Sequence, residues 1–559
     1  MSDVEAIKLA SRNLRGTIAE SLAAGGTRFG EDDLQLIKFH GTYQQEDRDQ
    51  RVERKKAGLE PAYQFMLRSR IPGGVVNAEQ YLVQDRIAGR FGNDTLRITT
   101  RQGIQLHGIL KGDLRATIRE ISASLLSTIS ACGDVNRNVM ACPAPPKNDA
   151  EADVQALAHR LAAHFTPTSG AYHDIWIDGE KIASPGAEEE PVDPIYGRTY
   201  LPRKFKMGVA LPGDNCIDIY TQDIGFAAVL RDGRIVGYTL LVGGGMGSTH
   251  GKATTYPRAA SPFAFVSAGE AVEVAEALLT TQRDFGDRTN RKHARFKYLV
   301  EERGIAWLRA EVESRLGRPL QLPVDVPFDD VDDHLGWIAQ RDGAFALGLY
   351  IENGRVKDAG AKRIRAGLRA VVERFRPDVR LTGQQNLILL GIAAADRDAV
   401  TTLLREHGIE TDPNAIGVRR YAMACPAAPT CGLAVAESER ALPDLITEIE
   451  RDLAALGLAQ ERVSVRMTGC PNGCARPYMG DIGIVGRSKD LYDIYLGGDW
   501  ANTRLNWTYK ASVRRANLVD ELRPLFEAWK YGRTDGETFG DYCERVGRDG
   551  LLELAAVPA

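Results

Sequence analysis

Two cysteines, Cys470 and Cys474, stand four residues apart in the segment MTGCPNGCARPYMGDIG, among glycine and proline residues that favour tight turns. A second pair, Cys425 and Cys431, stands six residues apart in MACPAAPTCGLA. Together they give the pattern C-x5-C followed by C-x3-C, with Cys470 39 positions after Cys431. Four cysteines in two close pairs can surround a metal site, so this pattern predicts one.

The spacing of these cysteines favours an iron–sulfur cluster over a single metal ion. Structural zinc is usually held by C-x2-4-C pairs in short modules that need the metal to fold. A 4Fe-4S cluster also takes four thiolates and tolerates wider spacings. Structural zinc and unligated cysteines remain the alternatives at this point.

The chain contains an internal repeat at a constant offset of 283 residues. LRITTRQGIQLHGI (96–109) resembles VRLTGQQNLILLGI (379–392), and VMACPAPP (139–146) resembles AMACPAAP (422–429). Two matches in one register predict a duplicated unit of about half the chain. Cys142 is then the counterpart of Cys425, and because its half lacks a matching pair we interpret it as a buried vestige.

Helical and strand patterns alternate along the chain, which indicates an α+β fold. Helices are expected at 153–165, 269–285, 361–376 and 434–457, and a strand containing Ile388 and Leu390 follows the third of them. Loops are expected at the acidic, proline-flanked 185–194 and at GGGMGSTHG (243–251). The second loop lacks the spacing of a phosphate-binding motif, and its glycines more plausibly let the backbone approach a cofactor.

The composition and net charge of the chain do not point to a particular class of binding partner. The 559 residues carry a formal net charge of −4, so nothing draws the whole chain to nucleic acid. We expect neither a secretory signal nor a membrane-spanning segment, and therefore a cytoplasmic protein. Eight cysteines in a reducing compartment are an improbable disulfide framework, and Cys132, Cys216 and Cys543, which lack partner spacing, are expected to be buried.

The cysteine pattern, with TGCPNGC as its second half, resembles the sirohaem-dependent sulfite and nitrite reductases. The similarity covers nearly the whole chain, and its blocks occur in the order of that family. They are IKFHGTYQQEDRD, FMLRSRIPGGV, LRITTRQGIQLHGI, GDVNRNV, TYLPRKFK, LLVGGG, TTQRDFG, MACPAAPTC and LGG. The closest match in the family is the haemoprotein (β) subunit of assimilatory sulfite reductases.

The resemblance implies two cofactors and one reaction. A 4Fe-4S cluster would be held by the four cysteines, and a sirohaem iron would take its axial thiolate from Cys474. The coupled centres would reduce sulfite to sulfide with six electrons, in the assimilation of sulfate leading to cysteine. The protein would supply position and electrostatics while the cofactors do the redox chemistry.

The resemblance also assigns roles to polar residues. Arg68, Arg137, Lys204 and Lys206 would line the substrate side and bind the oxyanion, with the lysines as proton donors. In KFK on a strand, alternate side chains share one face, so both lysines can point into one site. At an effective dielectric of about 20, a cation near 4 Å contributes about 4 kcal/mol of raw attraction before desolvation. From composition alone, RKFK is better interpreted as a solvated basic patch, and the family resemblance reverses that interpretation.

Three further residues are expected at the cofactors. Arg101 and Gln105 resemble residues that hold sirohaem carboxylates, and their spacing of four would put them on one face of a strand. Asn472, between two of the ligating cysteines, is expected to shape their loop rather than to react.

The family implies an internally duplicated fold with pseudo-twofold halves around a sirohaem cleft, in about three domains. We expect an N-terminal extension, two ferredoxin-like repeats, a sirohaem- and substrate-binding domain, and a domain binding the cluster and sirohaem. Their predicted bounds are 1–62 for the extension, 63–150 and 336–420 for the repeats, 151–335 for the substrate domain and 421–559 for the cluster domain.

The electron donor and the substrate stay open. No dinucleotide fingerprint is visible, so electrons must arrive from another protein, either an NADPH-dependent flavoprotein α-subunit, which the block pattern favours, or a ferredoxin. Nitrite is the alternative substrate, which the same scaffold would reduce to ammonia. A rival of another class is an iron–sulfur electron carrier or a zinc-stabilised interaction protein, but neither needs a cationic substrate pocket.

Overall fold

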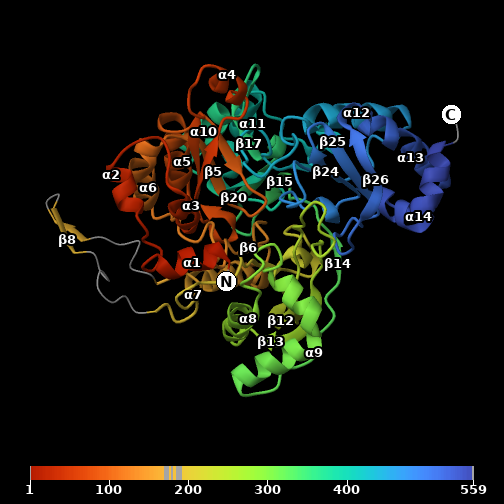
Figure 1. Ribbon diagram of the computed structural model, residues 1–559. Helices are drawn as coiled ribbons and strands as arrows, with labels where there is room; N and C mark the ends of the chain where they lie inside the picture. The colour runs from red at the N-terminus through yellow and green to blue at the C-terminus, as the bar shows by residue number, and fades with distance from the viewer. Residues whose placement is uncertain (1, 169–174, 178–179, 184–191, 557–559) are drawn as a thin grey trace.

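The computed structural model describes residues 2–168, 175–177, 180–183 and 192–556. Most of the loop expected at 185–194 lies outside these residues. In Figure 1 the first and second repeats lie side by side, the blue C-terminal region lies to their right, and the yellow-green region lies below.

Two five-stranded antiparallel sheets form the duplicated centre of the molecule, in the orders β1-β2-β5-β4-β17 and β15-β16-β21-β20-β3. The matched sequences form β4–β5 in one sheet and β20–β21 in the other, which confirms the duplication. The strands are β1 (Thr42–Glu46), β2 (Tyr63–Arg68), β3 (Val75–Val76), β4 (Leu96–Ile98), β5 (Ile104–Ile109), β15 (Gly336–Ala339), β16 (Phe345–Leu349), β17 (Arg355–Val356), β20 (Asp378–Leu381) and β21 (Leu387–Ile392).

Each of these sheets takes its last strand from the other repeat. β17 pairs with β4, with Arg355 opposite Arg97, and β3 pairs with β20, with Val76 opposite Val379. The two repeats therefore share one hydrophobic core, in which Leu106 and Leu389 are both buried. Likewise β1, from the expected N-terminal extension, is the edge strand of the first sheet.

Helices cover the duplicated sheets and the N-terminal region. They are α1 (Asp3–Ala10), α2 (Ile18–Ala23), α3 (Glu31–Leu36), α4 (Arg51–Lys56), α5 (Ala78–Arg90), α6 (Leu114–Ala123), α10 (Ile364–Phe375) and α11 (Arg397–Glu406), and the short hairpin β18 (Asp358–Ala359) and β19 (Lys362–Arg363) precedes α10.

The other two five-stranded sheets also have one topology, β13-β12-β11-β9-β6 and β22-β23-β24-β25-β26. In each, three parallel strands are followed by two antiparallel ones. The strands are β6 (Met140–Ala141), β9 (Met207–Ala210), β11 (Ile224–Arg231), β12 (Arg234–Val242), β13 (Ser261–Ser267), β22 (Ala422–Ala424), β23 (Val465–Thr468), β24 (Ile482–Ser488), β25 (Leu491–Leu496) and β26 (Trp507–Arg514).

Six longer helices pack on these sheets, and short strands connect the regions. The helices are α7 (Asp149–His164), α8 (Ala271–Phe285), α9 (Phe296–Leu316), α12 (Leu442–Ala455), α13 (Leu518–Gly532) and, at the C-terminal end, α14 (Phe539–Ala556). The short strands are β7 (Ile175–Ile177), β8 (Glu180–Ala183), β10 (Gly213–Asp214) and β14 (Phe328–Asp330). Three large cores result, one per sheet system, in agreement with the expected α+β fold of about three domains.

The expected helices at 153–165, 269–285 and 361–376 form as α7, α8 and α10. The helix expected at 434–457 is wrong at its start, because α12 begins only at Leu442. Residues before it are held in a loop: the N–H groups of Val435 and Ala436 both donate to the carbonyl of Gly469, at 2.8 and 3.1 Å. The segment packs on the cysteine loop instead of continuing the helix.

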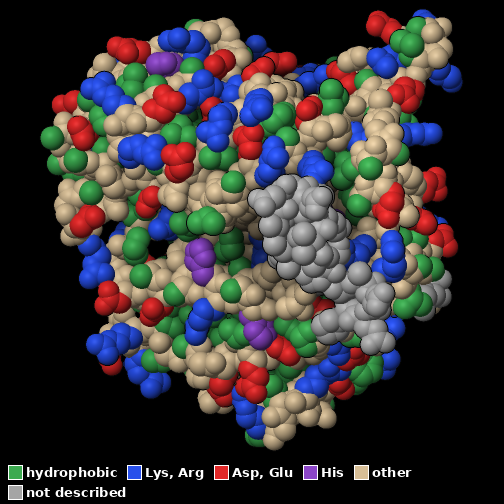
Figure 2. Space-filling model, turned by 90° about the vertical axis from the view of Figure 1, so that its left-hand side faces the viewer, with side chains coloured by type: hydrophobic (Ala, Val, Ile, Leu, Met, Phe, Trp, Pro, Cys, Tyr) green, Lys and Arg blue, Asp and Glu red, His purple; other side chains and the backbone are tan. Residues whose placement is uncertain are grey.

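Basic and acidic side chains are interspersed over the face shown in Figure 2. Among the described residues, no helix has both the length and the apolar character needed to cross a membrane.

Candidate active site

Parallel pairing of β22 and β23 brings the two cysteine pairs together. Cys425 follows β22 and Cys470 follows β23, and parallel strands end at the same edge of a sheet. Cys425 and Cys470 are buried, Cys431 is half-buried and Cys474 is exposed. Cys425 and Cys431 belong to a small apolar cluster with Met423, Ala427 and Ala434.

Hydrogen-bond donors point at two of the sulfurs. The N–H of Gly469 donates to Cys425 Sγ, and Asn472 Nδ2 donates to Cys470 Sγ, both at 3.4 Å. A side chain at Gly469 would place its Cβ 2.5 Å from Ala427 Cβ, so the loop closes only with glycine there. Asn472 thus contacts Cys470 within the cysteine loop, and its role there stays a prediction.

The four thiols influence one another electrostatically. Burial raises the pKa of Cys470 to about 11, with a further contribution from charge at Cys474, and the same two causes raise the pKa of Cys425 and Cys431. Mutually repelling thiolates, three of them wholly or partly buried, need a cationic centre to stabilise them. The cradle therefore fits a bound metal centre better than free thiols.

The spread of these sulfurs fits a cluster rather than one ion. A zinc ion bound at about 2.3 Å by each thiolate needs sulfurs about 3.8 Å apart. Among the described residues, the side chains whose ligand atoms all lie within 4.8 Å of one another are a group around Cys142, and the four cysteines are not part of it. The wider cradle of Cys425, Cys431, Cys470 and Cys474 suits a 4Fe-4S cluster.

Arg48 clamps the Cys431 loop and was missed from the sequence, although it lies in the IKFHGTYQQEDRD block. Its guanidinium donates to the carbonyls of Pro429, Cys431 and Ala434 at 2.9, 2.8 and 2.9 Å. These bonds fix the loop that presents Cys431.

The structure brings the four predicted anion-binding residues together. Arg68, at the end of β2, and Arg137 both donate to the carbonyl of Ala131, at 3.5 and 3.4 Å. The backbone N–H of Arg137 donates to the carbonyl of Phe205 at 2.8 Å, which places Arg137 beside Lys204 and Lys206. Arg68 also contacts Cys132 Sγ at 3.2 Å.

The segment KFK precedes a strand rather than lying in one, because β9 begins at Met207. The expected alternation nevertheless holds, since Phe205 pairs with Asn136 as an isolated bridge and is fully buried while both lysines are half-buried. A second segment, Arg295-Phe296-Lys297, repeats the pattern. The rings of Phe205 and Phe296 pack against each other, with centroids 5.3 Å apart.

Arg295 and Lys297 were missed by the sequence analysis, although the shared basic-Phe-Lys pattern was the signal that could have found them. Lys297 Nζ donates to the carbonyls of Gly245 and Gly247 at 3.0 and 2.6 Å, holding the glycine-rich loop. That loop packs on the cysteine loop: the N–H of Ser248 donates to the carbonyl of Pro471 at 2.8 Å.

Burial and crowding by like charges lower the pKa values of the lysines. Burial, followed by the charges of Arg203 and Arg295, lowers the pKa of Lys204 to about 7, whereas charge at Cys474 opposes the shift. Burial and the charge of Arg101 lower the pKa of Lys206 well below its ordinary value.

These cations lack neutralising partners. Asp223, the carboxylate that acts on Lys206, is already bound to Arg295 at 3.0 Å. In the parts of the chain that the structure describes, no carboxylate forms an ion pair with Arg68, Arg137, Lys204 or Lys206. A patch of uncompensated cations beside Cys474 is suited to binding an anion.

The predicted placement of Arg101 is wrong. It does not share a strand face with Gln105, because it lies in the β4–β5 turn, where Gln102 adopts a left-handed conformation (φ 53°) and β5 begins only at Ile104. Arg101 donates to Gln222 Oε1 at 2.8 Å and to the carbonyl of Met207 at 3.3 Å. Its buried Nε has no hydrogen-bond partner among the described residues.

Gln105 lies on β5 directly opposite Arg68. With its amide oriented to satisfy both groups, its oxygen accepts from Arg68 Nη2 at 2.5 Å and from Arg68 Nε at 3.3 Å. Gln105 thus orients Arg68.

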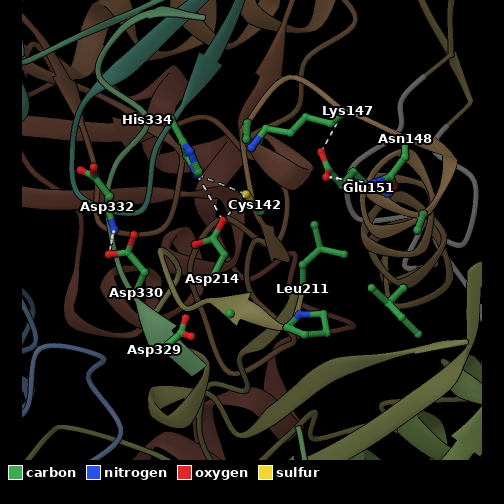
Figure 3. Close-up of a pocket in the computed structure, with 15 residues that line it drawn as sticks. Cys142, Lys147, Asn148, Glu151, Leu211, Asp214, Asp329, Asp330, Asp332 and His334 are labelled. Atoms are coloured by element: carbon green, nitrogen blue, oxygen red, sulfur yellow. Dashed lines mark hydrogen bonds and ion pairs between the residues drawn. The ribbon is translucent and has the colours of Figure 1, made fainter. Parts of the chain in front are cut away.

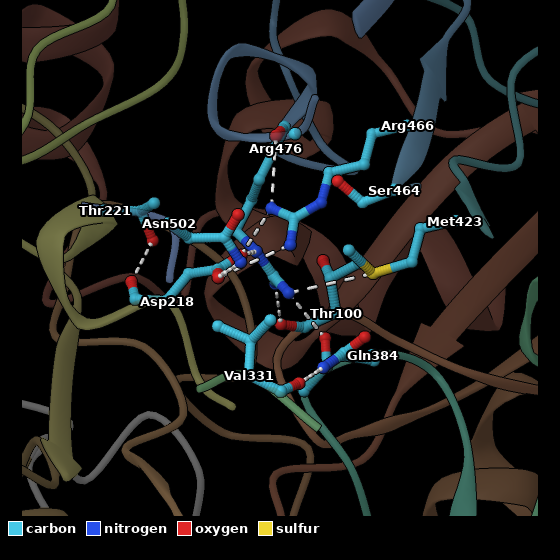
Figure 4. A network of polar contacts seen from close by, with 12 residues as sticks. Thr100, Asp218, Thr221, Val331, Gln384, Met423, Ser464, Arg466, Arg476 and Asn502 are labelled. Carbon is cyan, nitrogen blue, oxygen red and sulfur yellow. Dashed lines mark hydrogen bonds and ion pairs between the residues drawn. The ribbon is translucent and has the colours of Figure 1, made fainter. Parts of the chain in front are cut away.

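A buried ion-pair network anchors the base of the cysteine loop (Figure 4). Arg466 Nη1 lies 2.7 Å from Asp218 Oδ2, and Arg476 Nε also binds this carboxylate. Arg476 further donates to the carbonyls of Thr100 and Gly383, both at 2.8 Å. Through Thr100, whose hydroxyl donates to the carbonyl of Cys474 at 2.8 Å, the network ties both repeats to the loop.

Comparison with protein families gives two matches. The nitrite and sulphite reductase 4Fe-4S domain matches residues 156–320 and 418–558, and the nitrite/sulfite reductase ferredoxin-like half domain matches residues 58–124 and 338–407. Both matches occur twice, in agreement with the two pairs of equivalent sheets.

Relatives of similar length are also found. The sulfite reductase (NADPH) hemoprotein beta-component of Myxococcus xanthus (strain DK1622) is 47% identical, over 98% of this chain and 97% of that protein. The sulfite reductase (ferredoxin) of Synechococcus elongatus (strain ATCC 33912 / PCC 7942 / FACHB-805) is 46% identical over 99% and 91%. The solved structure of the Mycobacterium tuberculosis NirA protein is 27% identical and covers 97% of this chain and 95% of that one, with a TM-score of 0.79. This chain belongs to the nitrite and sulfite reductase family.

Proposed function

We propose that this protein is the haemoprotein component of a sulfite reductase, which reduces sulfite to sulfide with six electrons and supplies the sulfide for cysteine synthesis. The observation that carries the proposal is the group of uncompensated cations, Arg68, Arg137, Lys204 and Lys206, beside the exposed Cys474. An electron carrier has no use for such a site.

The residues present fit both cofactors of the family. Cys425, Cys431, Cys470 and Cys474 would hold the 4Fe-4S cluster, and Cys474, exposed on the side of Lys204, is the thiolate available to a sirohaem iron. The buried, unsatisfied Nε of Arg101 and the nearby cations suit the carboxylates of a sirohaem. When bound, these groups would relay the electrons from the donor protein and provide the substrate-binding iron.

The side chains of the pocket would position the anion and deliver protons. Arg68 and Arg137 offer planar guanidinium groups, held by Gln105 and by the carbonyls of Ala131 and Gly133, for contacts to an oxyanion. Lys204, with a pKa of about 7, is poised to give a proton and to recover it near neutral pH. Proton delivery is required because each S–O bond that breaks releases an oxygen as water.

We further propose an NADPH-dependent flavoprotein as the electron donor, as the name of the Myxococcus relative states for that protein. The Synechococcus relative is named for ferredoxin, so a ferredoxin is the second candidate.

The test is an assay that does not depend on the natural donor. Holoprotein from a host that makes sirohaem is supplied with reduced methyl viologen, and sulfide from sulfite and ammonia from nitrite are measured separately. The proposal predicts stoichiometric sulfide with a higher kcat/KM for sulfite. Ammonia formation without sulfide would assign the protein to nitrite reduction. If neither sulfide nor ammonia forms, the proposal that the protein is a reductase is contradicted.

A further inference from the structure

A second group of metal-ligating side chains lies outside the proposed active site. It consists of Cys142, Asp214, Cys216 and His334, whose ligand atoms all lie within 4.8 Å of one another. Figure 3 shows three of them, Cys142, Asp214 and His334, pointing toward one another at the wall of a cavity of about 480 Å³.

The position of this group is the pseudo-symmetric counterpart of the cysteine cradle. Ile224 pairs with Met207 in one sheet, and Ile482 pairs with Val465 in the other. Ile482 lies 258 positions after Ile224, and Val465 lies 258 positions after Met207. Cys216 and Cys474 have the same offset. Each stands two residues before a left-handed residue, Asp218 (φ 49°) or Arg476 (φ 52°), that opens a 3-10 turn, at Ile219–Thr221 or Pro477–Met479.

The interpretation of Cys142 as a vestige without a partner is therefore wrong in part. Cys142 is buried, as expected, and so are Cys132, Cys216 and Cys543. Its partner, however, is Cys216, which follows the neighbouring parallel strand β9 as Cys470 and Cys474 follow β23. The pair was missed because its sequence spacing, 74 residues, resembles no metal motif.

The distances suit a single ion. Cys142 Sγ lies 2.9 Å from Asp214 Oδ2 and 3.5 Å from His334 Nε2, and these two atoms are 3.2 Å apart. A tetrahedral ion with bonds of about 2.0–2.3 Å needs ligand separations of about 3.3–3.8 Å. The separations among these three atoms lie in or slightly below that range, and Cys216 Sγ lies within 4.8 Å of all three.

The surrounding backbone fixes two of the ligands. Asp214 Oδ1 accepts from the N–H of Cys216 at 2.8 Å, which leaves Oδ2 directed at the cluster. Neighbouring Asp333 accepts from Thr382 Oγ1 and Asn386 Nδ2 at 2.7 and 2.6 Å, which anchors His334 to the second repeat. Hydrogen bonds that orient a ligating side chain, such as the one to Asp214, are typical of metal sites.

We propose that Cys142, Asp214, Cys216 and His334 bind one Zn²⁺ ion. Two thiolates, one imidazole and one carboxylate are a zinc ligand set, and four protein ligands, of which Cys142 and Cys216 are buried and Asp214 and His334 half-buried, favour a structural site. The ion would join β6, the segment after β9 and the segment before β15, and so cross-link the substrate region to the second repeat. Asp329 and Asp332 at the cavity add negative charge that attracts a cation.

The experiment measures zinc in dialysed holoprotein by mass spectrometry and its ligands by X-ray absorption at the zinc edge. We expect about one zinc per chain, with two sulfurs at about 2.3 Å and two lighter ligands at about 2.0–2.1 Å. His334→Ala and Cys216→Ser should retain less than a tenth of the zinc. Lys147→Gln, which changes the same cavity without removing a ligand or a negative charge, should retain all of it.

Three results would overturn the proposal. They are no zinc in the wild type even after one equivalent is added, zinc coordinated without sulfur, or a Cys142–Cys216 disulfide in protein isolated without oxidant. The absorption data on the wild type decide the matter even if a variant fails to fold. The sirohaem spectrum is a separate readout, so loss of this site and failure of the proposed function can be told apart.

Discussion

At the scale of the residue, the strongest features are charges that lack partners. The sequence could predict the four cysteines and the four cations because their motifs are local. It could not predict that Arg101 leaves the strand, which depends on the left-handed turn at Gln102, nor that Arg48 and Lys297 hold loops far away in sequence. Such contacts are set by tertiary packing.

Lys204 should determine part of the pH dependence. Its pKa of about 7 means that it is protonated below pH 7 and loses its proton above. If it delivers protons, kcat/KM for sulfite should fall about tenfold per pH unit above that value. Lys204→Arg, which stays charged, should have lower activity at neutral pH but lack this part of the fall. The ionisation of sulfite itself affects both proteins equally, so identical pH profiles would remove Lys204 from proton delivery.

At the scale of the element, loops are positioned by contacts that periodicity does not reveal. Hydrophobic periodicity predicted α7, α8 and α10 well. It failed at 434–441, where the backbone bonds to Gly469 compete successfully with helix formation. The basic-Phe-Lys segments likewise precede regular structure, and their alternation comes from the packing of Phe205 on Phe296.

Arg48 should control the retention of the cluster. Arg48→Gln removes the guanidinium that binds the carbonyls around Cys431, and each charged hydrogen bond contributes about 1.5–3 kcal/mol. We expect the variant to fold but to lose iron several-fold faster in air, measured as bleaching of the visible absorption. Lys55→Gln, at an exposed position of α4, is the control. Equal bleaching rates would show that the clamp does not protect the cluster.

At the scale of the whole molecule, exchanged strands and a buried ion-pair network hold the duplicated halves together. The repeat at 283 residues predicted the duplication, but not that β3 and β17 cross between repeats. Nor could it predict the Asp218–Arg466–Arg476 network, because its members come from both equivalent sheets and are isolated in sequence.

Asp218 should be essential for stability. Although burial raises its pKa, the charges of Arg466 and Arg476 prevail and hold the pKa of Asp218 below its ordinary value. Asp218→Asn leaves two buried guanidinium groups uncompensated and should cost about 3–5 kcal/mol, measured by denaturant unfolding. A carboxylate whose pKa is lowered by folding stabilises the folded state at pH values above its pKa in the unfolded chain. The difference in the free energy of unfolding between wild type and variant should therefore shrink as acid protonates Asp218.

Asp541→Asn is the matched control, because its ion pair with Arg504 is partly exposed and contributes at most about 1 kcal/mol. If the two variants unfolded alike, the network would not be what joins the halves.

The most direct test of the account is the visible spectrum and iron content of the wild type and Cys474→Ser, made in a host that supplies sirohaem. The account predicts sirohaem bands that shift on addition of sulfite and about five irons per chain, four in the cluster and one in the haem. Cys474→Ser should lose the sirohaem bands, whereas Cys543→Ser, a buried cysteine of the C-terminal core, should keep them. Wild-type protein with iron–sulfur absorption alone, or colourless protein with zinc at these four cysteines, would contradict it.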